Sequence, residues 1–305
     1  MLNRTTFNFL NLLYLIGSIL FSSYLTLSFK VLERLKIPAF QAIVFNYLTC
    51  VVTGSVVNGS FPLSMQSTEQ TWFHWALLMG TSFIILFNLI AYTTQKIGIA
   101  VASVANKLSL VIPFTFSLYL YGEVATWIKV TGIVIAVLAV ILTCFPSKRN
   151  GEATHKPNPA LLLVLLPALL FVGSGLLDSL VKYVEQTYLD QSNSDAYLIA
   201  SFATAGAIGS LVLALLVFTG RQKFDPRSII AGIAIGIPNY FSIWCLVRML
   251  QAYQGNSSAV IPINNMGIVL FSSVVAWLLF KERLSALNWT GIALSLVAIG
   301  LIAFG

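Results

Sequence analysis

The chain has 305 residues, of which 58% are hydrophobic and 9% are charged, with a mean hydropathy of +0.88 and a formal charge of +7. A soluble domain carries about 25% charged residues, so this composition excludes a water-soluble globule. The basic residues fall in short connectors between apolar stretches, which favours a role in membrane orientation over nucleic-acid binding. The composition therefore predicts an integral membrane protein.

Ten apolar stretches are long enough to cross a bilayer, which takes about 20 residues in a helix. Because lipid offers no partners to backbone groups, each stretch is expected to be helical. No small-x-small cleavage site follows the first stretch, so we interpret it as a retained span. The expected spans are residues 8–28, 38–57, 72–94, 99–121, 126–145, 160–182, 194–219, 228–250, 256–280 and 286–304.

A polar connector, PSKRNGEATHKPNP, divides these spans into two groups of five. We predict two five-helix repeats, residues 1–150 and 151–305. Residues 95–143 align with residues 254–302 at an offset of 159, with ten identities in 49 positions. The polar and glycine matches carry the most weight, and they are Asn106 with Asn265, Glu123 with Glu282, and Thr131-Gly132 with Thr290-Gly291.

An odd number of spans in each repeat inserts the second repeat upside down. Loop charges agree, because the connector after the first span is basic whereas its counterpart after the sixth is acidic. The predicted fold class is an all-α integral membrane protein with ten transmembrane helices as two inverted five-helix repeats. By the positive-inside rule the basic connectors are cytoplasmic, which puts both termini outside the cytoplasmic (inner) membrane.

Lys107 lies roughly 10–14 Å along its expected helix, at 1.5 Å per residue. A lysine at the centre of a membrane helix costs about 2.5–3.5 kcal/mol on insertion scales. A water-filled cavity, an anionic partner or an anionic ligand must offset that cost. The alternative is a salt bridge inside the bundle, for instance to Asp178.

Amide side chains accompany this lysine at matching depth in spans 4 and 9. Asn106 is its neighbour, and Asn264 and Asn265 occupy the repeat-related position. Under an inverted repeat these two spans face each other near the midplane, where such transporters bind substrate. Hydrogen bonds between helices are the alternative role for these amides.

Two further polar pairs are candidates for a pore lining or, equally, for contacts between helices. Asn88 and Tyr92 share one face of span 3, at a spacing of one helical turn. Asn239 and Tyr240 follow Pro238 in span 8.

Asp178 and Lys182 are spaced for an ion pair on one helix face near the end of span 6. Asp178 as a proton-coupling carboxylate is the alternative. Glu123 and Glu282 sit at the ends of spans 4 and 9, as helix-terminal or loop features. With no Cys/His spacing typical of a metal site and no deep histidine, we predict no metal, no cofactor and no catalytic residue.

Residues 91–142 and 245–302 resemble the EamA-like branch of the drug/metabolite transporter superfamily. The shared pattern is a span, a small-residue turn, a span that ends in Glu, and Thr-Gly at the opening of the last span. The resemblance covers essentially the whole chain and implies ten helices, inverted halves and a central cavity lined by spans 1–4 and 6–9. It also implies transport of small metabolites such as amino acids and nucleotide-linked or phosphorylated compounds. Two features of this chain depart from the family as usually described. Family members have both termini in the cytoplasm, whereas the loop charges here place them outside. Lys107 is also not part of the general pattern of the family.

We therefore predict a secondary transporter that moves a small polar metabolite, anionic ones included, by alternating access around Lys107, Asn106 and Asn265. The chain has no Gly-x4-Gly-Lys-Ser/Thr motif, which argues against direct drive by ATP. The other functions to consider are a membrane scaffold or receptor without transport, and an intramembrane enzyme. The expected partners are the metabolite and the lipid bilayer, without nucleic acid. The oligomeric state, a homodimer included, is left open.

Overall fold

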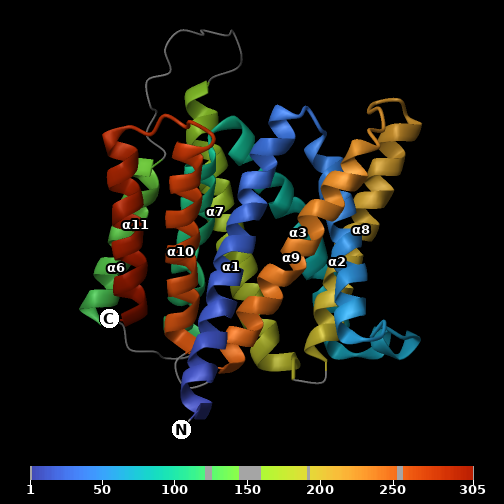
Figure 1. Ribbon diagram of the computed structural model, residues 1–305, viewed down its shortest axis with the longest axis horizontal. Helices are drawn as coiled ribbons and strands as arrows, with labels where there is room; N and C mark the ends of the chain where they lie inside the picture. The colour runs from blue at the N-terminus through green and yellow to red at the C-terminus, as the bar shows by residue number, and fades with distance from the viewer. Residues whose placement is uncertain (1, 121–125, 144–158, 191–192, 253–256, 305) are drawn as a thin grey trace.

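The computed structural model describes residues 2–120, 126–143, 159–190, 193–252 and 257–304 (Figure 1). Within these ranges the chain forms eleven α-helices and one short 3-10 helix, η1, and no strand. The helices are α1 (Leu2–Arg34), α2 (Ala39–Asn58), η1 (Met65–Glu69), α3 (Thr71–Lys96), α4 (Ile99–Leu108), α5 (Val111–Leu120), α6 (Trp127–Thr143), α7 (Pro159–Tyr188), α8 (Ser194–Phe218), α9 (Arg227–Ala252), α10 (Ser257–Leu278) and α11 (Ala286–Phe304).

Seven of the described helices are long and apolar enough to cross a membrane, namely α1, α2, α3, α7, α8, α9 and α10. Shorter apolar helices cover Ile99–Thr115, Trp127–Thr143 and Ala286–Ile302. Each expected span therefore coincides with at least one helix. The prediction of an α-helical membrane protein is confirmed at this level.

The fourth expected span, residues 99–121, is not one helix. It is broken at Ser109 and Leu110 into α4 and α5, and Pro113 lies in the first turn of α5. A proline cannot donate a backbone hydrogen bond and clashes with the preceding turn, whereas the first turn of a new helix tolerates it. Ending α4 before Pro113 and starting α5 afresh therefore removes the conflict.

The helices stand side by side as a bundle, with α6 and α11 packed on each other at one edge (Figure 1). In the rest of the bundle, α2 contacts α8 and α9, α1 contacts α9 and α10, and α3 contacts α7 and α8. Glycines bring some of these helices very close. A Cβ atom on Gly232 of α9 would lie 2.3 Å from Phe45 Cβ and 2.9 Å from the Ala42 carbonyl oxygen of α2.

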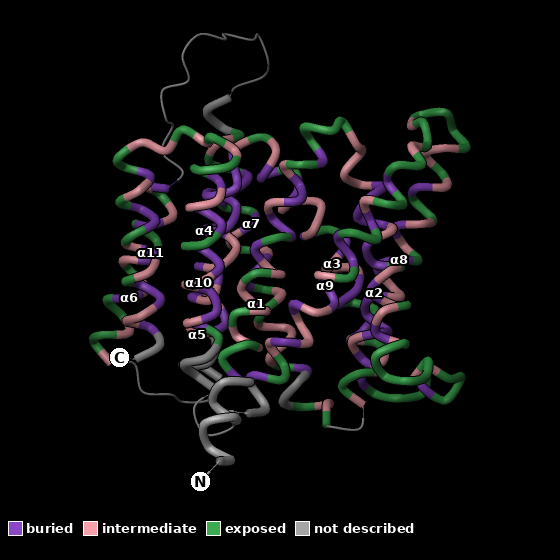
Figure 2. Tube along the Cα trace, in the orientation of Figure 1, coloured by how far each residue is buried: buried purple, intermediate pink, exposed green. Residues whose placement is uncertain are grey.

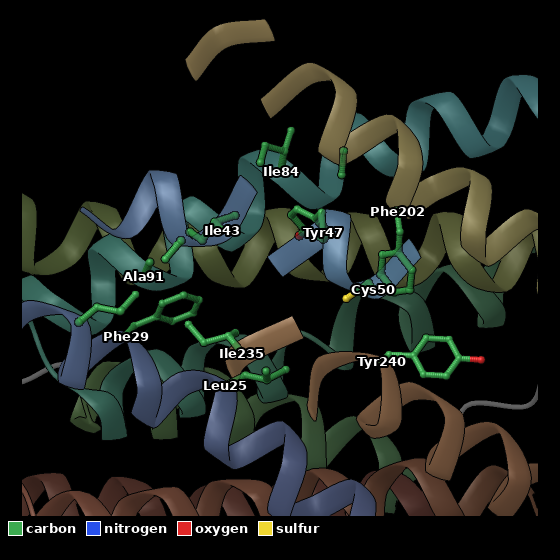
Figure 3. Close-up of a cluster of buried hydrophobic side chains, with 13 residues drawn as sticks. Leu25, Phe29, Ile43, Tyr47, Cys50, Ile84, Ala91, Phe202, Ile235 and Tyr240 are labelled. Carbon is green, nitrogen blue, oxygen red and sulfur yellow. The ribbon is translucent and has the colours of Figure 1, made fainter. Parts of the chain in front are cut away.

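The largest group of buried apolar side chains lies between α1, α2, α3, α8 and α9. Figure 3 shows Phe29, Ile43, Tyr47 and Phe202 within it, and Phe29 and Ile43 are completely buried. Buried residues mark the contacts between helices in Figure 2, while exposed ones mark their outer faces and the connectors. The outer faces carry large apolar side chains, as a lipid-facing surface requires.

Candidate functional site

The break between α4 and α5 lies beside polar side chains of the candidate site. The Ser109 hydroxyl can donate its one proton either to the Asn106 carbonyl in the last turn of α4 or to Asp178 Oδ2 on α7, which lies 3.4 Å from the hydroxyl oxygen. Discontinuous helices at membrane depth are tolerated where they are buried in protein or line a water-filled cavity. The break therefore sits beside a carboxylate instead of facing lipid.

The Asp178 side chain is exposed, although it does not belong to the apolar outer face of α7. The outward face of α7 is an apolar stripe of Leu165, Leu169, Val172 and Leu176, which are 44–52% exposed. At about 100° per residue, Asp178 lies roughly 150° around the helix from the centre of that stripe.

The inward face of α7 contacts α5. A Cβ atom on Gly175, one turn before Asp178, would lie 2.4 Å from the tip of Ile112. The carboxylate is thus on the side of α7 that packs against α4 and α5, yet it is not covered there. We infer that its exposed surface meets water instead of lipid.

Lys107 is the charged group that interacts electrostatically with Asp178. It is half-buried in the last turn of α4, and the two groups attract each other electrostatically without forming a direct ion pair within 4 Å. The last carbonyl groups of a helix favour a nearby cation, which adds to this attraction.

Asn264 and Asn265 lie on α10, which packs against α4. Asn265 is 7% exposed and Asn264 is 2% exposed, and the Asn264 Oδ1 atom has no hydrogen-bond partner in the protein. An unpaired buried acceptor costs about 1–3 kcal/mol. It is therefore an available partner for a donor group supplied by water or a ligand. Together with Asn106, these residues lie on helices that touch one another.

The other predicted pairs lie elsewhere. Tyr92 belongs to an exposed stripe of α3 shared with apolar Leu78 and Ile85, and Lys96 lies over its ring at 5.8 Å. Asn88 Nδ2 donates to the Ile84 carbonyl in its own helix at 2.7 Å. Nothing in the described contacts joins this pair to Lys107 or Asp178.

Asn239 and Tyr240 belong to the contact between α9 and α2. Asn239 Nδ2 donates to Asn46 Oδ1 at 3.1 Å, and Tyr240 is 5% exposed inside the apolar cluster of Figure 3. This is the geometry of a helix–helix contact. Lys182 lies one turn beyond Asp178 on α7, but the electrostatic partner of Asp178 is Lys107.

Three polar residues with notable contacts or burial were not among the residues predicted from the sequence. Ser109 links α4 to α7, Asn46 pairs with Asn239, and Gln41 is completely buried in α2. Asn46 and Gln41 are amide side chains in a largely apolar span, and this pattern could have predicted a buried polar contact. A serine at a helix break gives no such signal.

Comparisons with known proteins cover most of the chain and name no activity. No family model matches the chain. An uncharacterized protein of Haemophilus influenzae is 27% identical over 294 residues, which cover 93% of this chain and 95% of that protein. A solved structure described only as "Crystal structure of protein" covers 95% of this chain with a TM-score of 0.58 and 15% identity, and 96% of its own chain is matched. The structural likeness concerns the fold alone.

Proposed function

We propose that the chain is a secondary transporter that moves a small polar metabolite across the membrane by alternating access. The observation that carries the proposal is Asp178, an exposed carboxylate on the face of a membrane helix that lies opposite its apolar outer stripe. It faces Lys107 at the point where α4 ends. Charged groups within membrane helices mark ligand or ion pathways. Broken helices near the midplane are typical of transporter sites.

The proposed site contains Lys107, Asn106, Asn264 and Asn265, with Asp178 as the ion-coupling group. Lys107 would bind an acidic part of the substrate, and the amides would bind its neutral polar groups. Asp178 would exchange a proton or interact with a basic group. The Ser109 hydroxyl, between the α4 end and Asp178, positions the carboxylate.

Two inverted five-helix repeats, with all ten spans crossing the membrane, are part of the proposal. Support comes from reciprocal contacts between α6 and α11. A Cβ atom on Gly132 would meet Ile302, and a Cβ atom on Gly291 would meet Thr143. Residues 132 and 291 are 159 apart in the sequence, and so are residues 143 and 302. Two equivalent patches that contact each other reciprocally are what a two-fold axis produces.

The pattern of helix neighbours supports the same arrangement. If α7, α8 and α9 repeat α1, α2 and α3, the contact of α1 with α9 corresponds to that of α7 with α3. The contact of α2 with α9 corresponds to that of α8 with α3 in the same way, and all four contacts occur. The resemblance to EamA-like members of the drug/metabolite transporter superfamily fits this architecture.

The orientation proposed from the charges of the connectors has both termini on the non-cytoplasmic side of the inner membrane. The connectors after α1, α3, α8 and α10 carry or adjoin Lys36, Lys96, Arg221 and Lys281, and they lie at one end of the bundle (Figure 1). By the positive-inside rule this end, called here the basic-loop end, is cytoplasmic. A reporter fused to either terminus tests the orientation, and cytoplasmic signals from both would reverse it.

A metabolite-uptake screen in proteoliposomes tests the function. Among amino acids, organic acids and phosphorylated compounds, at least one is expected to accumulate in a protein-dependent way. Lys107→Ala is expected to lower the uptake rate by at least about tenfold, which corresponds to one charge-assisted hydrogen bond. The matched control is Lys281→Ala, which removes an exposed lysine from a connector. Uptake by Lys107→Ala at the rate of the control would remove this lysine from the mechanism.

A further inference from the structure

A carboxylate from the second half of the chain closes the start of α4 at the basic-loop end. Glu282, in the connector between α10 and α11, accepts the Ile99 backbone N–H at 2.8 Å through Oε1. Its Oε2 atom lies 3.5 Å from the Ala100 nitrogen. The first N–H groups of a helix have no partner within the helix, and a negative charge there is favourable. Glu282 thus caps a helix that lies 183 residues earlier in the chain.

The backbone at this contact is shaped for the carboxylate. Gly98, directly before α4, has φ +145°, a conformation that residues with a side chain rarely adopt. A Cβ atom there would lie 3.1 Å from Glu282 Oε2. The approach of Glu282 therefore depends on a glycine at this position, which makes the contact specific.

Further hydrogen bonds at the same end also join the two halves. Arg34, the last residue of α1, donates from Nη2 to the Phe280 carbonyl at 3.0 Å, and its guanidinium lies 4.6 Å from the centre of the Phe280 ring. Asn288, in the first turn of α11, donates from Nδ2 to the Thr143 carbonyl at 2.8 Å. The connector after α10 and the start of α11 are thus tied to α1, α4 and α6.

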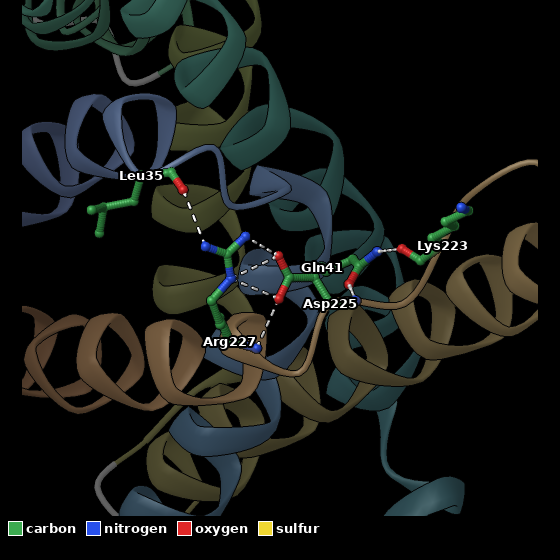
Figure 4. A network of polar contacts seen from close by, with 5 residues as sticks. All are labelled: Leu35, Gln41, Lys223, Asp225 and Arg227. Atoms are coloured by element: carbon green, nitrogen blue, oxygen red, sulfur yellow. Dashed lines mark hydrogen bonds and ion pairs between the residues drawn. The ribbon is translucent and has the colours of Figure 1, made fainter.

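A second set of hydrogen bonds joins the α1–α2 connector and the first turn of α2 to the α8–α9 connector and the start of α9 (Figure 4). Buried Gln41 donates to the Lys223 carbonyl at 2.8 Å and accepts the Asp225 N–H at 2.9 Å. The Arg227 guanidinium, held by Asp225, donates to the Leu35 carbonyl at 3.5 Å. Both sets cross from the first half to the second at the basic-loop end.

Aromatic rings make the corresponding contact between α3 and α7 at the opposite end. Trp75 lies 5.4 Å from Tyr183 and 5.9 Å from Tyr188, measured between ring centres. Ring packing tolerates sliding better than a capping hydrogen bond, which needs a fixed distance and angle. The two ends of the bundle are therefore held together by different chemistry.

We propose that the basic-loop end is the closed gate of this conformation and that Glu282 is its latch. Ser103 lies between the cap and Lys107 on α4, and Lys107 is eight residues, or roughly 12 Å, beyond Ile99. For the site to open toward the basic-loop end, the α10–α11 connector must separate from α4, which releases Glu282. This inference rests on the alternating access proposed above.

Accessibility of a cysteine at Ser103 tests the latch without any substrate. Ser103 is 2% exposed, and cysteine is close to it in size. The parent protein carries Ser103→Cys, with Cys50, Cys144 and Cys245 changed to alanine. It is reconstituted in vesicles, and a membrane-impermeant maleimide is added from the basic-loop side. Because labelling needs no transported compound, a failed uptake screen and a failed latch are separate results.

Slow labelling is expected in the parent, and Glu282→Ala is expected to raise the rate about tenfold, the factor for one lost charge-assisted hydrogen bond. Glu282→Gln keeps an acceptor oxygen and is expected to fall between the two. Glu69→Ala is the matched control, because it removes an exposed carboxylate from η1 at the opposite end. A rate in Glu282→Ala no higher than in Glu69→Ala would overturn the proposal, as would fast labelling of the parent from this side.

A second variant covers the case in which Glu282→Ala does not fold. Arg34→Ala removes an exposed side chain and the bond to the Phe280 carbonyl, so the fold is expected to survive. It is expected to raise the labelling rate about threefold, as fits one exposed hydrogen bond. An unchanged rate in folded Arg34→Ala would count against a gate at this end.

Discussion

The α2–α9 contact and the α4–α7 contact both place polar side chains between apolar helices. The polar side chains have different kinds of partner in the two contacts. Between α2 and α9, the Asn46 and Asn239 amides bond to each other and Gly232 lets the backbones touch. Between α4 and α7, Lys107 and Asp178 attract each other without direct contact, beside a helix break. The first contact joins its two amides by a direct hydrogen bond, whereas the second leaves an exposed carboxylate without a direct ion pair to the lysine.

The largest expected effect is a loss of transport activity on a change in the α4–α7 contact. Asp178→Asn keeps the size of the side chain and an acceptor for Ser109 but removes the charge. We expect uptake driven by a pH gradient to fall by at least about tenfold, since the amide cannot bind and release the coupling proton. The melting temperature should change little, because the group is water-accessible. Uptake that keeps its dependence on the pH gradient in this variant would contradict ion coupling through Asp178.

The α2–α9 contact should respond in stability. Asn239→Leu leaves the buried Asn46 amide without its partner, which should cost about 1–3 kcal/mol of unfolding free energy. Replacing both asparagines with leucine should recover most of that loss, because neither helix then buries an unpaired amide. Unfolding by denaturant in detergent measures the four members of this double-mutant cycle. If the two changes add without recovery, the amides do not act as a pair.

Glycine substitutions sharpen the comparison further. Gly232→Ala forces a methyl group against Phe45 Cβ and the α2 backbone and should cost about 1–2 kcal/mol, because overpacking outweighs the gain in helix propensity. Gly175→Ala should cost a similar amount, because the added Cβ atom would lie 2.6 Å from Ile112 Cβ on α5, which side-chain rotation cannot move. Gly300→Ala is the control, since a Cβ atom there has nothing within 4 Å. Melting temperatures of Gly232→Ala and Gly175→Ala as high as that of Gly300→Ala would show that neither contact is tight.

The smallest expected effect is that of pH on the exposed end of the α2–α9 contact. The Arg227 guanidinium lowers the pKa of Asp225 below its ordinary value. A carboxylate with a depressed pKa stabilises the fold above its unfolded pKa, and the contribution is lost as the pH falls through the folded pKa. Acidification below about pH 4 should therefore lower the melting temperature slightly more than in Asp225→Asn. An equal response would show that the exposed pair adds nothing to stability.

Hydropathy alone located the helices, because lipid leaves an apolar stretch of this length no structure other than a helix. It could not locate the break at Ser109, since Pro113 is compatible with either a kinked helix or a new first turn. The choice depends on what packs against the turn, here α7 with Gly175 and Asp178. Helix breaks are therefore set by tertiary contacts that a linear pattern does not contain.

The candidate site was predictable as a list of residue types and only partly as an arrangement. A lone lysine and a lone aspartate among apolar residues invite a pairing, and the structure does place Lys107 and Asp178 within electrostatic reach of each other. Asn239 and Asn88 looked equivalent to Asn106 in the sequence, yet Asn239 bonds to Asn46 and Asn88 to its own helix. Spacing identifies residues on one helix face, but it does not say which helix that face meets.

The central claim is that Asp178 faces water inside the bundle while the opposite stripe of α7 faces lipid. Asp178→Cys and Leu176→Cys, each in a background without the native cysteines, test it with a water-soluble, membrane-impermeant sulfonate thiol reagent in reconstituted vesicles. Leu176 is 52% exposed, so exposure alone does not distinguish the two positions. The account predicts that Asp178→Cys reacts at least about tenfold faster, because the reactive thiolate forms only in contact with water. An inert Asp178→Cys, or equal rates at both positions, would contradict it.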